Sequence, residues 1–180
     1  CMQEIFLPTI RAMQQEGRPF KGCLYFGLML TPDGPKVIEY NARFGDPEAQ
    51  VVLPRLKTDL VTIIESVIDG TLENVDIQWS KEAAGCVVMA SGGYPVKYEK
   101  GKVIDLGRAP EMAQVYHSGT GRDESGNLIT AGGRVLGVCC VRDTLREAVD
   151  AAYLAASQVR FEKLHMRTDI GARALAFINR

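Results

Sequence analysis

Glu39-Tyr40-Asn41-Ala42-Arg43-Phe44 alternates polar and apolar side chains, and Gly45-Asp46-Pro47-Glu48 follows directly. Side chains of a strand point to opposite faces in turn, so this alternation predicts a strand with Glu39, Asn41 and Arg43 on one face. Asp46 is a favourable N-cap and Pro47 suits a first helical position. The stretch therefore predicts a strand that leads directly into a helix.

The residues before this stretch complete a β-hairpin. Residues 22–31 form an apolar, partly aromatic run. Pro32-Asp33-Gly34-Pro35 is a turn signal, and the alternating segment 36–44 follows it. We therefore expect two antiparallel strands.

A helical pattern precedes the hairpin. Residues 1–16 place apolar side chains near helical spacing, and Gly17 is a plausible end. Pro8 is expected either to kink this helix or to mark its true beginning.

Two helices are expected after the hairpin. The first should end near residues 52–53, because Pro54 disfavours its continuation. Thr58 is expected to cap the second, which should end near Gly70.

The composition becomes polar around residues 71–82, and we place a domain boundary there, between residues 1–78 and 79–180. The second part is expected to be a small, mostly β domain with one long helix packed on it. Its expected elements are strands at 85–90, 102–104, 114–117 and 134–141, a helix at 144–159, and a short helix from Ile170 that Thr168 or Asp169 caps. The expected fold class is thus α+β.

Composition excludes several classes of partner. The chain has 180 residues and a formal net charge of -1, which gives no electrostatic reason to expect nucleic acid or an anionic membrane surface. No apolar run is long enough to span a bilayer, and no signal peptide is visible. The five cysteines are odd in number and lack a CxxC spacing, so free thiols in a reducing cytoplasmic setting are expected. The start at Cys1, within an amphipathic segment, suggests a fragment.

The polar face of residues 39–43 suits phosphate chemistry. A carboxylate and an amide oxygen two residues apart suit a hard cation such as Mg²⁺. Arg43 suits a phosphate or carboxylate through its planar fork, and a helix N-terminus after Gly45 favours anions. On alternation alone, however, a merely solvated strand face is the favoured interpretation.

A family resemblance changes that balance. Arg43-Phe44-Gly45-Asp46-Pro47-Glu48-Ala49-Gln50 is similar to the signature segment of phosphoribosylamine–glycine ligases, and the surrounding hairpin resembles that family's central hairpin. Further similar segments follow in the expected order, at residues 57–60, 87–95, 116–119, 132–136 and 169–171.

The resemblance implies that residues 1–78 are the C-terminal half of an ATP-grasp domain and that 79–180 are the family's C-terminal domain. It implies a ligase in which ATP phosphorylates glycine. The amine of 5-phosphoribosylamine then attacks the glycyl phosphate and gives glycinamide ribonucleotide, ADP and phosphate in purine biosynthesis. Such phosphoryl transfer depends mainly on positioning and charge neutralisation.

The resemblance also implies roles for single residues. Glu39 and Asn41 match positions that bind Mg²⁺ or Mn²⁺. Arg43 matches an arginine that faces the transferred phosphoryl group. The remaining candidates are Asp46 and Glu48 for substrate recognition and Leu28 or Met29 for the adenine of ATP, with helix capping and ordinary core packing as the respective alternatives.

The family's N-terminal domain and first ATP-grasp half have no counterpart in these residues, and no phosphate-binding glycine motif occurs. The partner implied is therefore the N-terminal portion of the same enzyme, and the isolated chain is expected to be inactive. If so, apolar surface on residues 22–31 should be partly exposed or dimerised.

Two alternatives stay open. Another ATP-grasp enzyme would share the Glu-x-Asn-x-Arg pattern, although the Gly-Asp-Pro-Glu after Phe44 favours the glycine ligase. A non-catalytic binding or structural module would need only residues 79–180, with the polar strand merely solvated.

Overall fold

The computed structural model describes residues 1–178 and divides the chain into two compact units. The first unit comprises residues 1–46 and 56–78, and the second comprises 47–55 and 79–180. Residues 47–55 thus pack with the second unit although they lie within residues 1–78. Both units mix helices with antiparallel strands, and no described helix is long and apolar enough to cross a bilayer.

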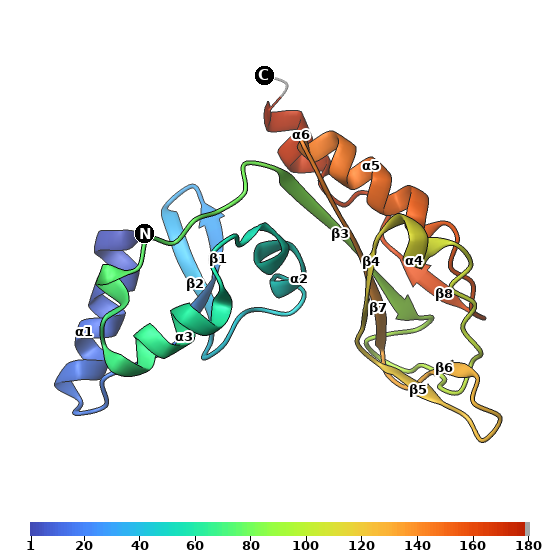
Figure 1. The fold of residues 1–180 in the computed structure, drawn as a ribbon, viewed down its shortest axis with the longest axis horizontal. Helices are drawn as coiled ribbons and strands as arrows, with labels where there is room; N and C mark the ends of the chain where they lie inside the picture. The colour runs from blue at the N-terminus through green and yellow to red at the C-terminus, as the bar shows by residue number, and fades with distance from the viewer. Residues whose placement is uncertain (179–180) are drawn as a thin grey trace. The chain divides into compact units, whose positions relative to one another are not determined.

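The first unit is a hairpin with helices beside it (Figure 1). The hairpin consists of β1 (Tyr25–Thr31) and β2 (Gly34–Asn41), paired antiparallel as predicted. The helical elements are a π-helical turn at Met2–Phe6, α1 (Leu7–Gln15), α3 (Leu60–Asp69) and a 3₁₀ turn at Leu72–Asn74.

The N-terminal helix resolves the question raised by Pro8. This proline stands in the first turn of α1, directly after the π-helical turn, so it marks the beginning of the α-helix. The helix ends as predicted at Gly17, which adopts a left-handed φ of 71°. Backbone bonds from Gly17 to Gln14 and from Arg18 to Met13 close a Schellman motif.

The cap of α3 differs from the prediction by one residue. Asp59, not Thr58, is the N-cap, and its carboxylate accepts a hydrogen bond of 2.9 Å from the Thr62 amide. The Thr58 hydroxyl is occupied elsewhere, because it accepts a bond of 2.7 Å from the amide of Gln78. Gly70 ends the helix in the left-handed conformation, as expected.

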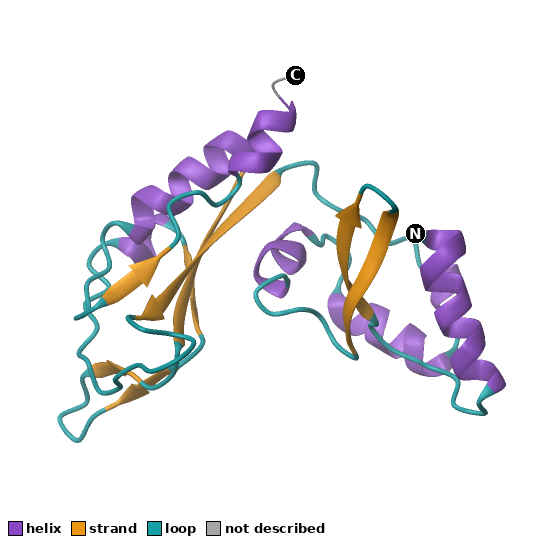
Figure 2. Ribbon diagram, turned by 180° about the vertical axis from the view of Figure 1, so that it is seen from behind, coloured by secondary structure: helices purple, strands orange, loops and turns teal. Residues whose placement is uncertain are grey.

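The second unit is built on a four-stranded antiparallel sheet in the order β4-β7-β3-β8 (Figures 1 and 2). Its strands are β3 (Ala83–Ser91), β4 (Gln114–His117), β7 (Arg134–Arg142) and β8 (Leu164–Met166), and β5 (Thr120–Arg122) pairs with β6 (Leu128–Thr130) in a separate small sheet. Its helices are α2 (Ala49–Val52), a 3₁₀ turn at Leu53–Arg55, α4 (Ala109–Met112), α5 (Leu145–Ala156) and α6 (Ala172–Ile178).

The long helix α5 covers one face of this sheet, as Figure 1 shows. A capping box begins it, with Thr144 and Glu147 bonding each other's backbone amides. Gly85 permits the close approach, because a Cβ there would lie 3.1 Å from the backbone of Val149. The predicted inward positions of α5 are buried, namely Ala148, Val149, Ala152, Ala155 and Ala156.

Several short elements departed from the sequence prediction. Residues 102–104 make no strand but only a single bridge from Val103 to Ile129. The final helix begins at Ala172, two residues after the predicted start. The three-residue strands β5, β6 and β8 were not predicted, because runs of that length carry too little periodicity to be recognised.

The apolar core lies entirely in the second unit. All buried apolar side chains of the described residues belong to positions 87–161, with Met89, Val135 and Leu136 fully inaccessible. In the first unit, all of which is described, only Gly45 and Ser66 are buried. The second unit therefore closes its own core, whereas the first does not.

This contrast predicts which shortened side chains destabilise the second unit. We expect Leu136→Ala to lower the unfolding free energy of the second unit by about 2–5 kcal/mol, because it removes buried methyl groups and leaves a cavity. Leu154→Ala on α5 is the matched control, since Leu154 is 59% exposed and should change stability by less than about 0.5 kcal/mol. Urea unfolding followed by circular dichroism measures both, and equal effects would contradict this account of the core.

Candidate functional site

The candidate site centres on Glu39 and Asn41, which the hairpin holds on one face of β2. Their side chains touch, because Asn41 Nδ2 donates a hydrogen bond of 3.1 Å to Glu39 Oε1. Glu39 pairs with Gly27 of β1, and a Cβ at position 27 would lie only 2.8 Å from Glu39 Cγ. The missing side chain of Gly27 therefore leaves the space in which the Glu39 side chain lies.

A β-bulge lies directly beside this pair. Gly27 pairs with Glu39, but Leu28 pairs with Val37, so β2 carries one extra residue at Ile38. A bulge shifts the alternation of side chains by one position. The register upstream of Ile38 therefore does not fix the orientation of Glu39, and the bulge decides it.

Arg43 lies outside the strand. The prediction extended the strand to Phe44, but β2 ends at Asn41, so alternation does not place Arg43 on the face of Glu39 and Asn41. Its guanidinium folds back instead, and Nη1 donates a bond of 2.7 Å to the carbonyl of Phe44. The strand ends early because β1 begins at Tyr25, which pairs with Asn41 and leaves later residues without a partner.

The two adenine candidates fall on different faces of β1. Met29 alternates with Gly27 and therefore lies on the face of Glu39, whereas Leu28 lies on the opposite face with Phe26. That opposite face packs on aromatic rings, with Phe26 4.5 Å from Phe6 and 5.2 Å from Tyr40 between ring centroids. Met29 is 53% exposed and so remains accessible to a ligand.

The predicted helix cap at Asp46 is wrong. Residues 46–48 form a turn, and α2 begins only at Ala49 with Glu48 as its N-cap residue. Glu48 makes no capping hydrogen bond through its side chain, and α2 has four residues. The helix end expected after Gly45 thus provides no anion site.

The predicted end of this helix is confirmed, because α2 stops at Val52 and Pro54 lies in the 3₁₀ turn.

The donor set suits a hard cation. Asn41 uses its amide nitrogen toward Glu39, which leaves its oxygen as a ligand beside a carboxylate, and oxygen ligands are those that Mg²⁺ prefers. Within residues 1–178 no group of three or more His, Cys, Asp or Glu side chains is placed to hold a metal. Mg²⁺ is commonly bound by one or two protein oxygens together with nucleotide phosphates and water, so two ligands from this hairpin are sufficient.

The two histidines of the chain lie in the second unit. His117 is exposed at the end of β4 and contacts the Thr120 hydroxyl at 3.1 Å. His165 is exposed on β8. Gly133 is required by packing, because a Cβ there would overlap the ring of Tyr94. None of these features supplies a second candidate site.

The cysteines are free thiols, as predicted, and Cys139 and Cys140 are buried. Cys139 Sγ donates a bond of 3.0 Å to the carbonyl of Gln50 in α2. Burial raises the pKa of the Cys139 thiol to about 11, and the neighbouring Cys140 adds to the effect. A thiol with such a pKa is protonated near neutrality and is not an activated nucleophile.

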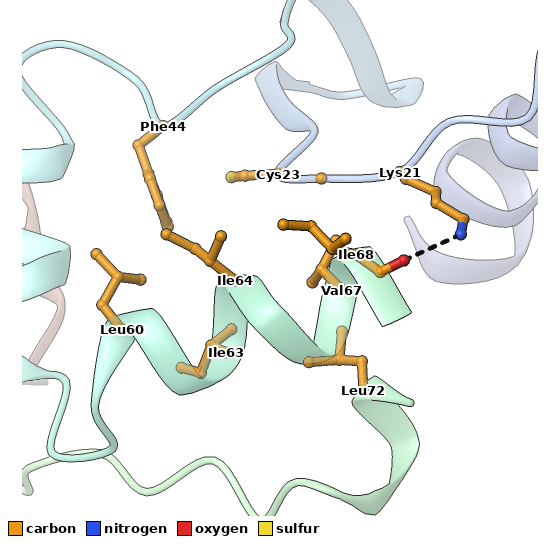
Figure 3. Close-up of a pocket in the computed structure, with 10 residues that line it drawn as sticks. Lys21, Cys23, Phe44, Leu60, Ile63, Ile64, Val67, Ile68 and Leu72 are labelled. Carbon is orange, nitrogen blue, oxygen red and sulfur yellow. Dashed lines mark hydrogen bonds between the residues drawn. The ribbon is translucent and has the colours of Figure 1, made fainter. Parts of the chain in front are cut away.

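The first unit also contains an apolar cavity of about 480 Å³ (Figure 3). It lies between α3 and the segments on either side of the hairpin, and Phe44 points toward Ile64 of α3. The dashed line in Figure 3 marks a hydrogen bond of 3.4 Å from Lys21 Nζ to the Ile68 carbonyl at the edge of this cavity. This lining suits apolar groups rather than phosphates.

Two family models match the chain. The model described as phosphoribosylglycinamide synthetase, ATP-grasp (A) domain, matches residues 1–49, and the one described as phosphoribosylglycinamide synthetase, C domain, matches residues 84–173. The candidate pair Glu39 and Asn41 lies within the first match.

Curated relatives agree with these models. A phosphoribosylamine–glycine ligase of Halalkalibacterium halodurans is 52% identical over 98% of this chain and 41% of its own length. A bifunctional purine biosynthetic protein of Pichia angusta is 45% identical over 96% of this chain and 22% of its own. The chain therefore spans about two fifths of the single-function relative that it matches.

A solved structure also agrees. The crystal structure of a phosphoribosylamine–glycine ligase from Thermotoga maritima matches with a TM-score of 0.81 and 36% identity, over 94% of this chain and 42% of that one. The match of the A-domain model places the chain in the ATP-grasp class. Within that class, the chain belongs to the phosphoribosylamine–glycine ligase family.

The buried thiol generates a prediction on alkaline stability. The thiol of Cys139 loses its proton near pH 9.0 in the unfolded chain and near pH 11 in the folded chain. Its contribution to the unfolding free energy is therefore fully present below pH 9 and is lost as the pH rises through 11. We expect the unfolding free energy to fall by about 1–3 kcal/mol more in the unsubstituted chain than in Cys139→Ala between pH 8 and 11. Urea unfolding at each pH measures this difference.

Cys1→Ala is the control, because Cys1 is exposed at the start of the chain. Its pH dependence should equal that of the unsubstituted chain. A Cys139→Ala variant with the same alkaline loss as the unsubstituted chain would show that this thiol ionises equally in both states.

Proposed function

We propose that this chain is part of an ATP-dependent carbon–nitrogen ligase that joins glycine to 5-phosphoribosylamine. The products are glycinamide ribonucleotide, ADP and phosphate. The observation that carries the proposal is the Glu39–Asn41 pair, seated over Gly27 in a segment that matches the family's ATP-grasp domain. The names of the relatives, which the chain matches over almost its whole length, support the reaction.

In this proposal residues 1–78 are the C-terminal half of the ATP-grasp domain and residues 79–180 are the family's C-terminal domain. The N-terminal portion of the same enzyme supplies the remaining half. A solvated strand face, the simplest alternative, gives no reason for Gly27, because an exposed strand gains stability from a side chain at that position.

The hairpin residues are assigned distinct roles. Glu39 and Asn41 hold Mg²⁺, or Mn²⁺ in its place, through their side-chain oxygens. The metal, when bound, bridges and neutralises the nucleotide phosphates. Met29, rather than Leu28, contributes an apolar contact to the adenine, because it shares the face of Glu39 and is accessible.

Arg43 acts on the transferred phosphoryl group or the glycyl phosphate. Its exposed guanidinium donates to the Phe44 carbonyl, a neutral acceptor that a phosphate oxygen can replace with a stronger, charge-assisted bond. Arg43 therefore moves from the backbone to the substrate when substrate is present. Asp46, in the turn that follows, and Glu48 are proposed to recognise the substrate amine or ribose.

A substitution series tests these roles in the full-length polypeptide that contains this chain. ADP release is followed with ATP, Mg²⁺, glycine and phosphoribosylamine generated in place. We expect Glu39→Gln and Arg43→Ala each to lower kcat/KM by about 100-fold or more, because each removes charge stabilisation of the transferred group. The 180-residue chain alone should release no ADP in a glycine-dependent manner.

Asp33→Asn is the matched control for the series, since it removes a carboxylate from the exposed hairpin turn without touching the site. It should keep full activity. Full activity in folded Glu39→Gln and Arg43→Ala would reduce the polar strand to a solvated face and remove the site assigned here.

Gly27 supports a separate prediction. In Gly27→Ala the new methyl group meets Glu39 Cγ and must displace that side chain, while an alanine in a strand costs little by itself. We expect the Mg²⁺ concentration for half-maximal ADP release to rise by about tenfold or more, which corresponds to about 1.4 kcal/mol of metal binding. Gly34→Ala on the same hairpin is the control. A Cβ there meets no atom within 4 Å, but its positive φ of 93° strains an alanine, so this variant reports the effect of hairpin strain without displacing Glu39. An unchanged Mg²⁺ requirement in Gly27→Ala would show that Glu39 does not hold the metal.

A further inference from the structure

Within the second unit, residues 47–55 pack on the face of the sheet opposite α5. Their helix α2 contacts both β3 and β7. Side chains alternate along β7, so Cys140, which belongs to the core under α5, and Cys139 point to opposite faces. The Cys139 thiol donates its hydrogen bond of 3.0 Å to the Gln50 carbonyl, so α2 lies on the face of Cys139.

The side chain of Gln50 also lies against β7. Gly137 shares the face of Cys139, and a Cβ at position 137 would lie 4.0 Å from Gln50 Cγ and 3.3 Å from Cys86 Sγ. The absence of a side chain at Gly137 therefore allows α2 to approach the strand closely. Gln50 is seated on β7 through both its carbonyl and its side chain.

The end of the segment is fixed to the second unit as well. The Ser80 amide donates a bond of 2.7 Å to the Arg55 carbonyl, and Arg55 Nη2 donates a bond of 3.1 Å to the Ser80 carbonyl. Ser80 is buried. Residues 47–55 are thus held at two separate points, and the Cys139 bond is the one nearer to the candidate site.

Glu48, a proposed substrate ligand, belongs to this segment. The amide of Gln50 donates a bond of 3.3 Å to the Pro47 carbonyl, and the amides of Val51 and Val52 donate bonds of 3.1 and 3.0 Å to the Glu48 carbonyl. The Glu48 side chain makes no capping bond to the helix, which leaves its carboxylate available to a ligand. The place of Glu48 therefore depends on where Gln50 is seated.

We propose that Cys139 is a positioning residue for substrate binding. Its thiol seats α2 through the Gln50 carbonyl and thereby fixes where Glu48 presents its carboxylate to the amine or ribose of phosphoribosylamine. The proposal rests on the proposed function, in which Glu48 recognises that substrate. Cys139 itself does not touch substrate, because it is buried beneath α2, and its effect comes from the loss of binding when a ligand group is misplaced by about 1 Å.

Steady-state kinetics of Cys139→Ala in the full-length polypeptide test the proposal. ADP release is measured at varied concentrations of phosphoribosylamine generated in place and, separately, of ATP. We expect the KM for phosphoribosylamine to rise about fivefold or more, because Glu48 contacts only this substrate, while kcat and the KM for ATP stay within about twofold. An unchanged KM for phosphoribosylamine would overturn the proposal.

Cys140→Ala is the matched control for a merely structural effect. Cys140 is the next residue of β7 and is 3% exposed against 2% for Cys139, but its thiol donates to the Met112 carbonyl, at 3.7 Å, on the other face. This variant should lose similar stability and keep both KM values. Equal rises in KM for phosphoribosylamine in the two alanine variants would overturn the proposal.

Cys139→Ser tests whether the hydrogen bond itself is responsible. Its hydroxyl is also a donor, so we expect the KM for phosphoribosylamine to return to within about twofold of the unsubstituted value. A serine variant as impaired as Cys139→Ala would contradict a role for the bond to Gln50.

Hydrogen exchange in the 180-residue chain gives a readout that needs no activity. We expect the amides of Val51 and Val52 to exchange about tenfold faster in Cys139→Ala and at the unsubstituted rate in Cys140→Ala. Faster exchange, together with an unsubstituted full-length polypeptide that shows no glycine-dependent ADP release, would refute the proposed function and leave the seating of α2 by Cys139 in place. Ligase activity with unchanged exchange at these amides would refute the positioning role alone.

Discussion

The register between β1 and β2 is the constraint on which the candidate site depends. Gly27 stands opposite Glu39, and the extra residue at Ile38 turns the following side chains toward the face where Asn41 reaches the carboxylate. A shift of one residue would place both polar side chains on the aromatic face that packs against Phe6. The apolar packing of one face thereby fixes the polar chemistry of the other.

The two units are stabilised in different ways. The second encloses a core between its four-stranded sheet and α5, with close approaches at Gly85 and small residues along the helix. The first is a hairpin and helices around an open cavity, with its apolar side chains half-covered. The unit that contains the proposed ligands Glu39 and Asn41 is thus the one without a buried apolar core.

The residues proposed to bind the metal and the phosphoryl group lie in different parts of the chain, on the strand and just after it. The hairpin brings Glu39 and Asn41, the proposed metal ligands, into contact through its register and their mutual hydrogen bond. Arg43 follows the strand, and its guanidinium donates to the Phe44 carbonyl, a neutral acceptor that the proposed phosphate ligand would replace. In the proposed function, two oxygen ligands on the strand and a cation just after it suit the transfer of a phosphoryl group.

The sequence by itself determined the elements whose signals are local. The hairpin around Pro32-Asp33-Gly34-Pro35, the ends of helices at Gly17 and Gly70, and the inward stripe of α5 all follow from turn chemistry and periodicity, and the family follows from the motif at residues 43–50. The tertiary structure decided what depends on pairing. It placed Met29 rather than Leu28 on the face of Glu39, ended β2 before Arg43, and moved the start of α2 to Ala49. It also left Val61, Ile64 and Ile68 of α3 exposed while the other apolar side chains of this helix are half-buried, because a periodic pattern records which side chains are apolar but not which neighbour covers them.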